Sequence, residues 1–382
     1  MDGRYSMTMK IYIAKEKHPG ENRTAMVPEN AAKLVKRGAE VIIESGVGNA
    51  CGYSDADYTA AGATVAGNNQ TALSSADMVL RLRKPPVDEI GRLKQGSVHI
   101  SFLDPFNESE LIQKLAAQKI SAISMEMIPR ITRAQKMDAL TSQANLAGYV
   151  AVILAADYLN RIFPMMTTAA GTIMSAKVFI IGAGVAGLQA IATAKRLGAN
   201  IDAFDTRPVV AEQVQSLGAK FVKIDLGETG QTKDGYAKAL TDEQIAKQRE
   251  GIKKLCAMAD VVITTAQVFG KKAPIIITAD VVAGMKKGSV IIDLPIESGG
   301  NVEGSVFNQV VEKNGVKIIG LANLPGRVPV PASKVYSTNL LSLIEEFWSK
   351  EEKKFVLKLD DEIIKGCLMT HDGQICSQAV KK

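Results

Sequence analysis

The sequence predicts an α/β protein with two domains, each built on a mostly parallel sheet. Short apolar segments of strand length alternate with helical patterns in both halves of the chain. In the second half, a glycine-rich turn joins one apolar strand to a helix, which is typical of a doubly wound sheet. The chain has 382 residues, which is enough for two domains with separate cores.

Five short apolar segments predict the strands of the first domain, which we place at residues 1–135. Helical patterns lie between them, including residues 29–37, which Gly38 ends, and residues 107–118. Because strands and helices alternate, we expect a mostly parallel sheet. The predicted strands are residues 10–14, 40–44, 78–82, 99–103 and 120–124.

A long helix is predicted at residues 135–161, where apolar side chains recur every three or four positions, and we expect it to join the domains. The second domain, residues 136–324, is Rossmann-like. Its apolar runs are continuous, as in buried parallel strands. Besides the strand of the glycine-rich turn, the predicted strands are residues 201–205, 220–224, 260–265, 290–293 and 316–320.

The last segment, residues 325–382, is expected to return to the first domain. It contains a helical pattern at residues 333–348, an apolar run at 355–359 and a hairpin-like turn at 370–373. Within the second domain, residues 226–239 are rich in glycine and polar side chains. Such a stretch predicts a long mobile loop, of the kind that forms lids over ligands.

The glycine-rich turn reads Val-Phe-Ile-Ile-Gly-Ala-Gly-Val-Ala-Gly over residues 178–187. Gly182 permits the tight turn, Gly184 lets the backbone approach a pyrophosphate, and Gly187 lets the helix pack on its strand. The N–H groups of the helix start, including that of Val185, would face the phosphates. The pattern predicts a dinucleotide site; the alternative is a turn that binds no ligand.

An acidic residue, Asp205, ends the next apolar strand about twenty residues further on, where such a fold places its ribose-binding carboxylate. A carboxylate accepts hydrogen bonds from the ribose hydroxyls and repels a 2′-phosphate, so we predict NAD(H) rather than NADP(H). Arg207 complicates this prediction, because a nearby arginine can accommodate the 2′-phosphate. The alternative for Arg207 is a surface cation that stacks on adenine.

A polar segment, residues 127–149, lies near the expected boundary between the domains. If a helix begins near Gln135, then Gln135, Asp138 and Thr141 share one face, and Arg130 precedes them in a loop. These groups are suited to a carboxamide, and ligand clefts tend to form between domains. Helix capping with hydrogen bonding between domains is the alternative.

Composition excludes several classes of function. The 46 basic and 40 acidic residues give a net charge of +6 without a basic tract among aromatics, so nucleic acid is not an expected partner. The 4 cysteines form no C-x-x-C and the 3 histidines show no metal-binding spacing, which predicts a cytosolic protein without a metal site. No uninterrupted apolar stretch of membrane length and no apolar leader is apparent.

The chain resembles the NAD(H)-binding component, domain I, of proton-translocating nicotinamide nucleotide transhydrogenase. The resemblance runs from about Met9 to the end of the chain. It is strongest in five motifs, at residues 129–138, 142–149, 163–171, 182–198 and 297–301.

This resemblance implies a role for each matching residue. Residues at the nicotinamide end also act in hydride transfer, and the serine usual there is threonine in this chain. The nicotinamide end would be held by Arg130, Ile131, Thr132, Gln135, Asp138 and Thr141. The rest of the nucleotide would be held by Asp205, Thr206, Arg207, Gly235 and Tyr236 of the mobile loop, Gln248 and Gln267. Gln267 stands where an apolar residue is usual, and Pro295 where alanine is usual.

The activity implied is Re/Si-specific transfer of a hydride from NADH directly to NADP⁺ on a partner subunit, coupled to proton translocation by membrane subunits. The transfer needs no protein acid or base, because the chemistry belongs to the cofactors. The resemblance also implies a homodimer. Without a membrane span of its own, the chain would be a peripheral subunit on the cytoplasmic face of the inner membrane.

Two alternatives remain. Alanine dehydrogenase shares the fold, and Arg23 matches its substrate arginine. Its substrate lysine, catalytic histidine and catalytic aspartate are replaced here by Arg81, Asp104 and Glu297. Amino-acid oxidation needs a general base, so we rank this enzyme second and interpret Arg23 as structural. A non-catalytic NAD sensor is the third hypothesis.

Overall fold

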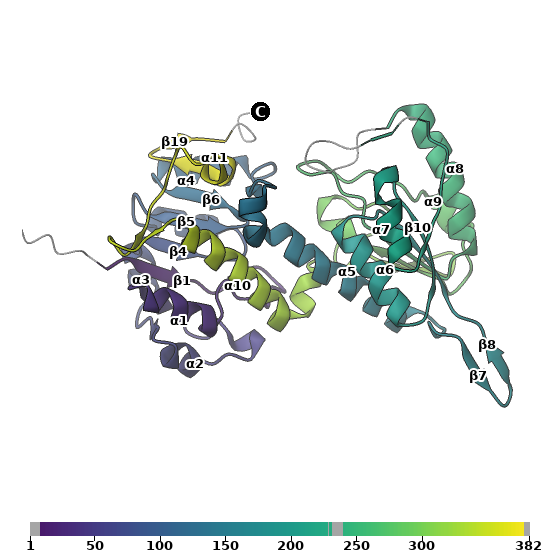
Figure 1. Cartoon of the computed structure of the whole chain (residues 1–382), viewed down its shortest axis with the longest axis horizontal. Helices are drawn as coiled ribbons and strands as arrows, with labels where there is room; N and C mark the ends of the chain where they lie inside the picture. The colour runs from purple at the N-terminus through teal and green to yellow at the C-terminus, as the bar shows by residue number, and fades with distance from the viewer. Residues whose placement is uncertain (1–7, 228, 231–239, 378–382) are drawn as a thin grey trace, which may run out of the picture. The chain divides into compact units, whose positions relative to one another are not determined.

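The protein is described by a computed structural model that covers residues 8–227, 229–230 and 240–377. The chain divides into two compact units (Figure 1). Unit 1 comprises Met1–Gln143 and Gly326–Lys382, and unit 2 comprises Ala144–Pro325. Each unit contains one large sheet with mostly parallel strands, which confirms the predicted fold class.

Unit 1 is built on a sheet with the strand order β19-β18-β6-β5-β4-β1-β2-β3. The six strands from β3 to β6 run parallel, whereas β18 pairs antiparallel with β6 and β19 with β18. The C-terminal segment therefore completes this sheet. The strands are β1 Lys10–Ile13, β2 Glu40–Ile43, β3 Thr64–Val65, β4 Met78–Leu80, β5 Val98–Ser101, β6 Ser121–Ser124, β18 Leu368–His371 and β19 Gln374–Ile375.

Helices cover both faces of this sheet, which explains why its strands are apolar throughout. Ile11 and Ile13 of β1 pack in a core with α1 and α10, while Tyr12 between them packs in a second core with α3 and α4. The side chains alternate because successive residues of a strand point to opposite faces. The helices are α1 Pro28–Lys36, α2 Asp55–Ala60, α3 Asn69–Ser75, α4 Ser109–Ala117, α10 Pro329–Glu346 and α11 Glu362–Cys367.

Unit 2 is built on a sheet with the order β11-β10-β9-β12-β13-β15-β14, and of these described strands only the edge strand β14 is antiparallel. The order reverses between β9 and β12, which is where ligands bind in such folds. The elements are β9 Lys177–Ile181, β10 Asn200–Phe204, β11 Lys220–Phe221, β12 Val261–Thr264, β13 Val290–Asp293, β14 Val310–Lys313, β15 Val316–Ile319, α6 Val185–Arg196, α7 Ala211–Ser216, α8 Asp242–Met258 and α9 Ala279–Ala283.

Two predicted strands are shorter than expected. The strand predicted at 220–224 ends at Phe221, since β11 is an edge strand with one neighbour, and Ile224 instead packs against Gly251 of α8. The run at 355–359 forms only β17, Lys354–Phe355, paired with β16, Trp348–Ser349. The predicted hairpin at 370–373 is confirmed: Asp372 and Gly373 turn between β18 and β19 with positive φ.

The long helix predicted at residues 135–161 is α5, Ala139–Tyr158. The prediction was wrong at its start, because residues Thr132–Met137 form a separate 3₁₀ helix, η4. Within the described residues, α5 is long and apolar enough to cross a membrane by length and mean hydropathy, 1.4, but half of that window is buried in the protein. Core helices of globular proteins meet the same two criteria.

Candidate functional site

The glycine-rich turn between β9 and α6 has the geometry that its spacing predicts. Gly182 has φ +98°, and a Cβ on it would lie 2.5 Å from Thr265 Oγ1. A Cβ on Gly187 would lie 1.9 Å from the Gly182 carbonyl oxygen, so both positions exclude a side chain. By contrast, no atom of the described residues lies within 4 Å of the Cβ position of Gly184. The turn is therefore tight inside and open outside.

The open side of this turn suits a phosphate. Gly184 is the N-cap of α6, and no side chain among the described residues caps the helix, whose first residue is Val185. Helix N-termini carry free N–H groups and a partial positive charge that attract anions. A bare backbone with open space in front of it fits the pyrophosphate of a dinucleotide, which this turn would hold.

Asp205, directly after β10, lies beside the turn. Its Oδ2 accepts a hydrogen bond from the Ala183 N–H at 2.8 Å, which ties the carboxylate to the turn. The Arg207 guanidinium binds both carboxylate oxygens, with Nε 2.9 Å from Oδ1 and the NH2 nitrogen 2.8 Å from Oδ2. This hydrogen-bonded pair raises the pKa of Arg207. The sequence predicted both residues at the site but not their pairing.

On the other side of the turn, Asn301 holds the loop after β12 in place. Its side chain is fully buried, accepts a hydrogen bond from Ala266 N–H and donates to the carbonyls of Ala266 and Pro274. Thr265 donates its hydroxyl to the Gly182 carbonyl at 3.0 Å. Gln267, the next predicted contact, is exposed. No local pattern in the sequence indicates that Thr265 or Asn301 supports this loop.

The predicted nicotinamide-binding residues lie in unit 1, on η4 and the start of α5. Arg130, Thr132 and Gln135 are exposed, and Ile131 is half-buried. Since Gln135 is in η4, it does not share an α-helical face with Asp138 and Thr141, which corrects that expectation. The segment from Arg130 to η4 presents its side chains from a loop and a 3₁₀ turn.

Asp138 caps α5, which is the alternative that the sequence left open. Its carboxylate accepts hydrogen bonds from the N–H of Thr141 at 2.9 Å and from the Thr141 hydroxyl at 2.6 Å. Residues Asp138 and Thr141 are therefore a hydrogen-bonded pair at the helix start. Both are only half-buried, so the capping bonds leave the pair open to solvent.

The Arg130 to Asp138 segment is anchored from behind. Arg133 binds Glu346 of α10 at 3.0 Å and Asp361 at 2.7 Å. The Lys136 carbonyl accepts a hydrogen bond from Asn339 of α10 at 2.8 Å. These contacts hold the backbone around Gln135 while its side chain remains exposed.

The remaining predicted residues are less informative. Thr206 lies next to Asp205, and its carbonyl accepts the Thr229 hydroxyl. Gln248 is buried in α8. Gly235 and Tyr236 lie outside the described residues, as does most of the loop predicted at 226–239.

The positions that correspond to a dehydrogenase substrate site carry a packed ion network in unit 1. Arg23 binds Glu21 through two nitrogens and donates to Gln143 at 2.7 Å. Arg81 is buried and binds Glu89 and the Lys15 carbonyl. Asp104 has a φ of +53°, and its N–H donates to buried Glu126. In unit 2, Glu297 accepts a hydrogen bond from the Asn323 N–H at 3.3 Å.

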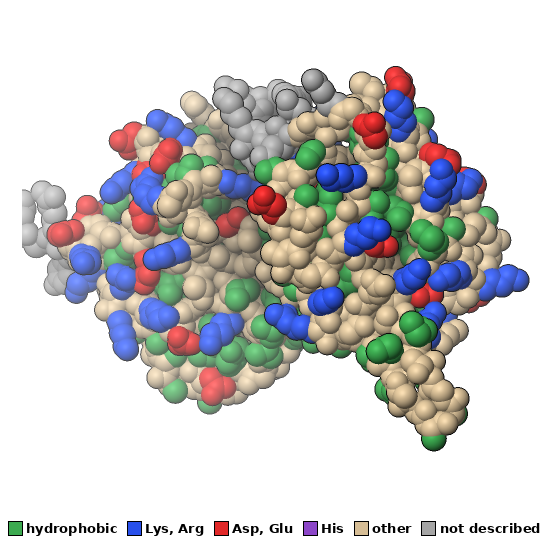
Figure 2. Space-filling view, turned by 45° about the vertical axis from the view of Figure 1, so that its right-hand side comes forward, with side chains coloured by type: hydrophobic (Ala, Val, Ile, Leu, Met, Phe, Trp, Pro, Cys, Tyr) green, Lys and Arg blue, Asp and Glu red, His purple; other side chains and the backbone are tan. Residues whose placement is uncertain are grey.

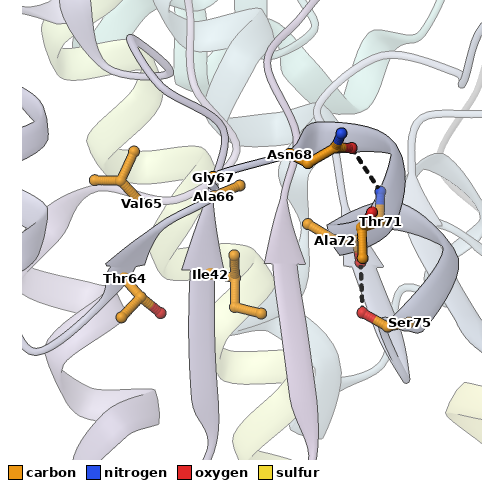
Figure 3. A pocket seen from close by; sticks show the side chains of 9 residues that line it. All are labelled: Ile42, Thr64, Val65, Ala66, Gly67, Asn68, Thr71, Ala72 and Ser75. Atoms are coloured by element: carbon orange, nitrogen blue, oxygen red, sulfur yellow. Dashed lines mark hydrogen bonds between the residues drawn. The ribbon is translucent and has the colours of Figure 1, made fainter.

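Other regions of the described chain offer little for a ligand. A groove of about 300 Å³ beside β2 and β3 is lined by small apolar and hydroxyl side chains and by Asn68, which caps α3 (Figure 3). Among residues 8–227, 229–230 and 240–377, no group of three His, Cys, Asp or Glu side chains is arranged to hold a metal ion.

These features define a protein with a dinucleotide-binding turn at the switch point of a doubly wound sheet. Residues 12–147 match the family described as alanine dehydrogenase/PNT, N-terminal domain, and residues 151–378 match alanine dehydrogenase/PNT, C-terminal domain. The chain belongs to this alanine dehydrogenase/PNT family.

Within the family, the chain is similar to transhydrogenase subunits. It is 47% identical to an NAD(P) transhydrogenase subunit alpha protein of Rhodospirillum rubrum over 97% of this chain and 99% of the relative. The crystal structure of transhydrogenase from Sinorhizobium meliloti superposes with a TM-score of 0.86 and 42% identity, covering 96% of this chain and 99% of that one. An L-alanine dehydrogenase structure has a TM-score of 0.81 and 25% identity, covering 98% of each chain.

Proposed function

We propose that this chain is the NAD(H)-binding subunit of a proton-translocating transhydrogenase. Its role is to present NADH to NADP⁺ bound on a partner subunit, while membrane-spanning subunits couple the reaction to proton movement. It acts as a peripheral protein on the cytoplasmic face of the membrane. The observation that carries the proposal is the open turn at Gly184 with Asp205 fixed beside it, in a chain nearly half identical to a transhydrogenase subunit.

Each group of residues has one task in this proposal. The turn of Gly182, Gly184 and Gly187 and the N-terminus of α6 bind the pyrophosphate, and Asp205 binds the adenosine ribose. Arg130, Gln135 and the Asp138–Thr141 pair orient the nicotinamide ring. Bound NADH supplies the hydride. The protein contributes position and exclusion of water, which needs no titrating side chain.

The first test is nucleotide preference. NADH and NADPH are titrated separately by fluorescence into the purified chain. We expect clear preference for NADH, because Asp205 repels a 2′-phosphate. Asp205→Ser should weaken NADH binding by at least about tenfold, since hydrogen bonds to a charged group are worth roughly 1.5–3 kcal/mol. Equal affinity of the parent for both nucleotides would contradict the proposal.

The proposed homodimer has a candidate surface in unit 2. Strands β7 Met166–Thr168 and β8 Gly171–Ile173 form a hairpin that stands out from unit 2 (Figure 2). Met165, Met166, Ile173 and Met174 are 62, 46, 44 and 64% exposed. An isolated hairpin is marginally stable in water, and exposed apolar clusters mark interaction surfaces. We assign a second copy of this chain as its partner.

A groove close in sequence to the hairpin suits a self-complementary contact. It holds about 790 Å³ and is lined mainly by apolar residues, including Leu159, Phe163 and Leu197. Light scattering should give the mass of a dimer for the parent and of a monomer for Met166→Ser with Met174→Ser. Val310→Ser is the control, since Val310 is 38% exposed on β14. A serine variant that stays dimeric would exclude the hairpin.

A further inference from the structure

The Asp205 carboxylate is fully occupied in the structure. The Arg207 N–H and Nε reach Oδ1 at 2.8 and 2.9 Å, and the Ala183 N–H and the guanidinium NH2 nitrogen reach Oδ2, both at 2.8 Å. A carboxylate has about four lone-pair sites, and four donors fill them here. A further donor can bind only if one of these leaves.

Two of the four donors are fixed. The Ala183 N–H belongs to the glycine turn, and the Arg207 N–H belongs to the turn after β10. The other two belong to one flexible side chain, and its guanidinium spans both oxygens. The cis-diol of a ribose offers two O–H donors to the same pair of oxygens. The guanidinium and the diol are therefore alternative ligands of one carboxylate.

We propose that Arg207 competes with the adenosine ribose for Asp205, so that NAD(H) binds by displacing the guanidinium. This inference rests on the proposed function, in which Asp205 holds the ribose. The pair is well protected: the Asp205 and Arg207 side chains are 6% and 14% exposed. Bidentate arginine–carboxylate pairs are among the stronger hydrogen-bonded contacts. In the nucleotide-free chain the competent, open form is thus a minor population.

The exchange has a kinetic signature. Apparent affinity falls by the fraction of protein in the competent form, and opening precedes binding. Removing the guanidinium should therefore speed association and leave dissociation unchanged. If Arg207 instead holds the bound nucleotide, for example by stacking on adenine, its removal should speed dissociation. The two roles thus change opposite rate constants.

Arg207→Met is the test variant, because methionine keeps an unbranched apolar stem and has no donor. Stopped-flow fluorescence of NADH should show association at least about fivefold faster and Kd lower by the same factor, with dissociation within about twofold. Lys313→Met, an exposed cation on β14, controls for lost positive charge and should leave both rates near the parent values. Unchanged or slower association, or faster dissociation, would overturn the exchange.

The Asp205→Ser variant separates the two proposals. If it weakens NADH binding but Arg207→Met does not tighten it, the exchange is wrong and the ribose role of Asp205 stands. If Asp205→Ser leaves NADH affinity unchanged, the ribose role fails and the exchange fails with it. Tighter NADH binding by Arg207→Met together with weaker binding by Asp205→Ser supports both.

Discussion

Gly148 of α5 lies against the backbone of Ala186 in α6, so closely that a Cβ on Gly148 would be 2.2 Å from the Ala186 carbonyl oxygen. Ala186 is in the first turn of α6, just after the N-cap Gly184. The contact therefore fixes the end of the helix that faces the proposed pyrophosphate site. The long helix supports the glycine-rich turn from below.

We expect Gly148→Ala to destabilise unit 2 and to weaken NADH binding. Overpacking costs typically 1–3 kcal/mol, and here the obstacle is backbone, which cannot move aside as a side chain can. Calorimetry should show a melting temperature lower by several degrees, since each kcal/mol is worth roughly 2–4 °C for a domain of this size. Gly284→Ala is the control: its Cβ would lie 3.6 Å from its nearest neighbours, and its melting temperature should stay the same. A Gly148→Ala variant as stable as the parent would contradict the close contact.

Gln135→Asn should affect hydride transfer more than NADH affinity. The exposed Gln135 side chain contributes little binding area, but a shift of about 1 Å at the reacting ring can cost on the order of 10²-fold in rate. With an NADP(H)-binding partner domain, single-turnover transfer should slow by at least about tenfold, or roughly 1.4 kcal/mol, while Kd changes by only a few-fold. Lys136→Gln alters the neighbouring exposed side chain and should match the parent. Parental transfer rates in Gln135→Asn would show that this residue does not position the ring.

The chain should not aminate pyruvate. Arg81 is bound to Glu89 and the Lys15 carbonyl, and the positions of the catalytic histidine and aspartate hold Asp104 and Glu297. Without a general base the reaction lacks its proton acceptor. NADH oxidation with pyruvate and ammonium should stay at background, with an alanine dehydrogenase as the positive control. Turnover above background would favour the rival assignment.

Stability should fall as the pH rises through neutrality because of Glu16. Burial raises the pKa of this carboxyl to about 7, although N–H groups of Leu82 and Arg83 donate to it. The folded state thus binds the proton more tightly than the unfolded state, in which the pKa is about 4.5. The stabilisation is complete below that value and is lost as pH rises through 7, by up to about 3 kcal/mol.

Urea unfolding at pH 5 and pH 8 measures this loss. Glu16→Gln stays neutral and keeps an acceptor for Leu82, so its stability should change less between the two pH values than that of the parent. Glu110→Gln, on the exposed side of α4, should behave like the parent. An equal pH dependence in Glu16→Gln and the parent would rule out Glu16 as the cause.

Local pattern predicted most of the fold and some of the site. The spacing of Gly182, Gly184 and Gly187 was sufficient, because each glycine acts on atoms set by the turn itself or by the adjoining strand. Asp138 was assigned to a shared helical face because periodicity alone does not reveal where a helix is capped. The role of Asn301 depends on Ala266, 35 positions away, and such contacts follow from the packed sheet. The Asp205–Arg207 pair depends on a side-chain rotamer, which the sequence does not specify.

The return of the chain to unit 1 sets an order of events during synthesis. Thr370 and Ala122, hydrogen-bonded neighbours in the same sheet, are separated by 248 positions. While the ribosome makes the intervening residues, β6 has no partner on its outer edge, and unit 2 is already complete. Exposed strand edges promote association between nascent chains. Unit 2 is therefore expected to fold first, and unit 1 depends on protection by chaperones until its last strands emerge.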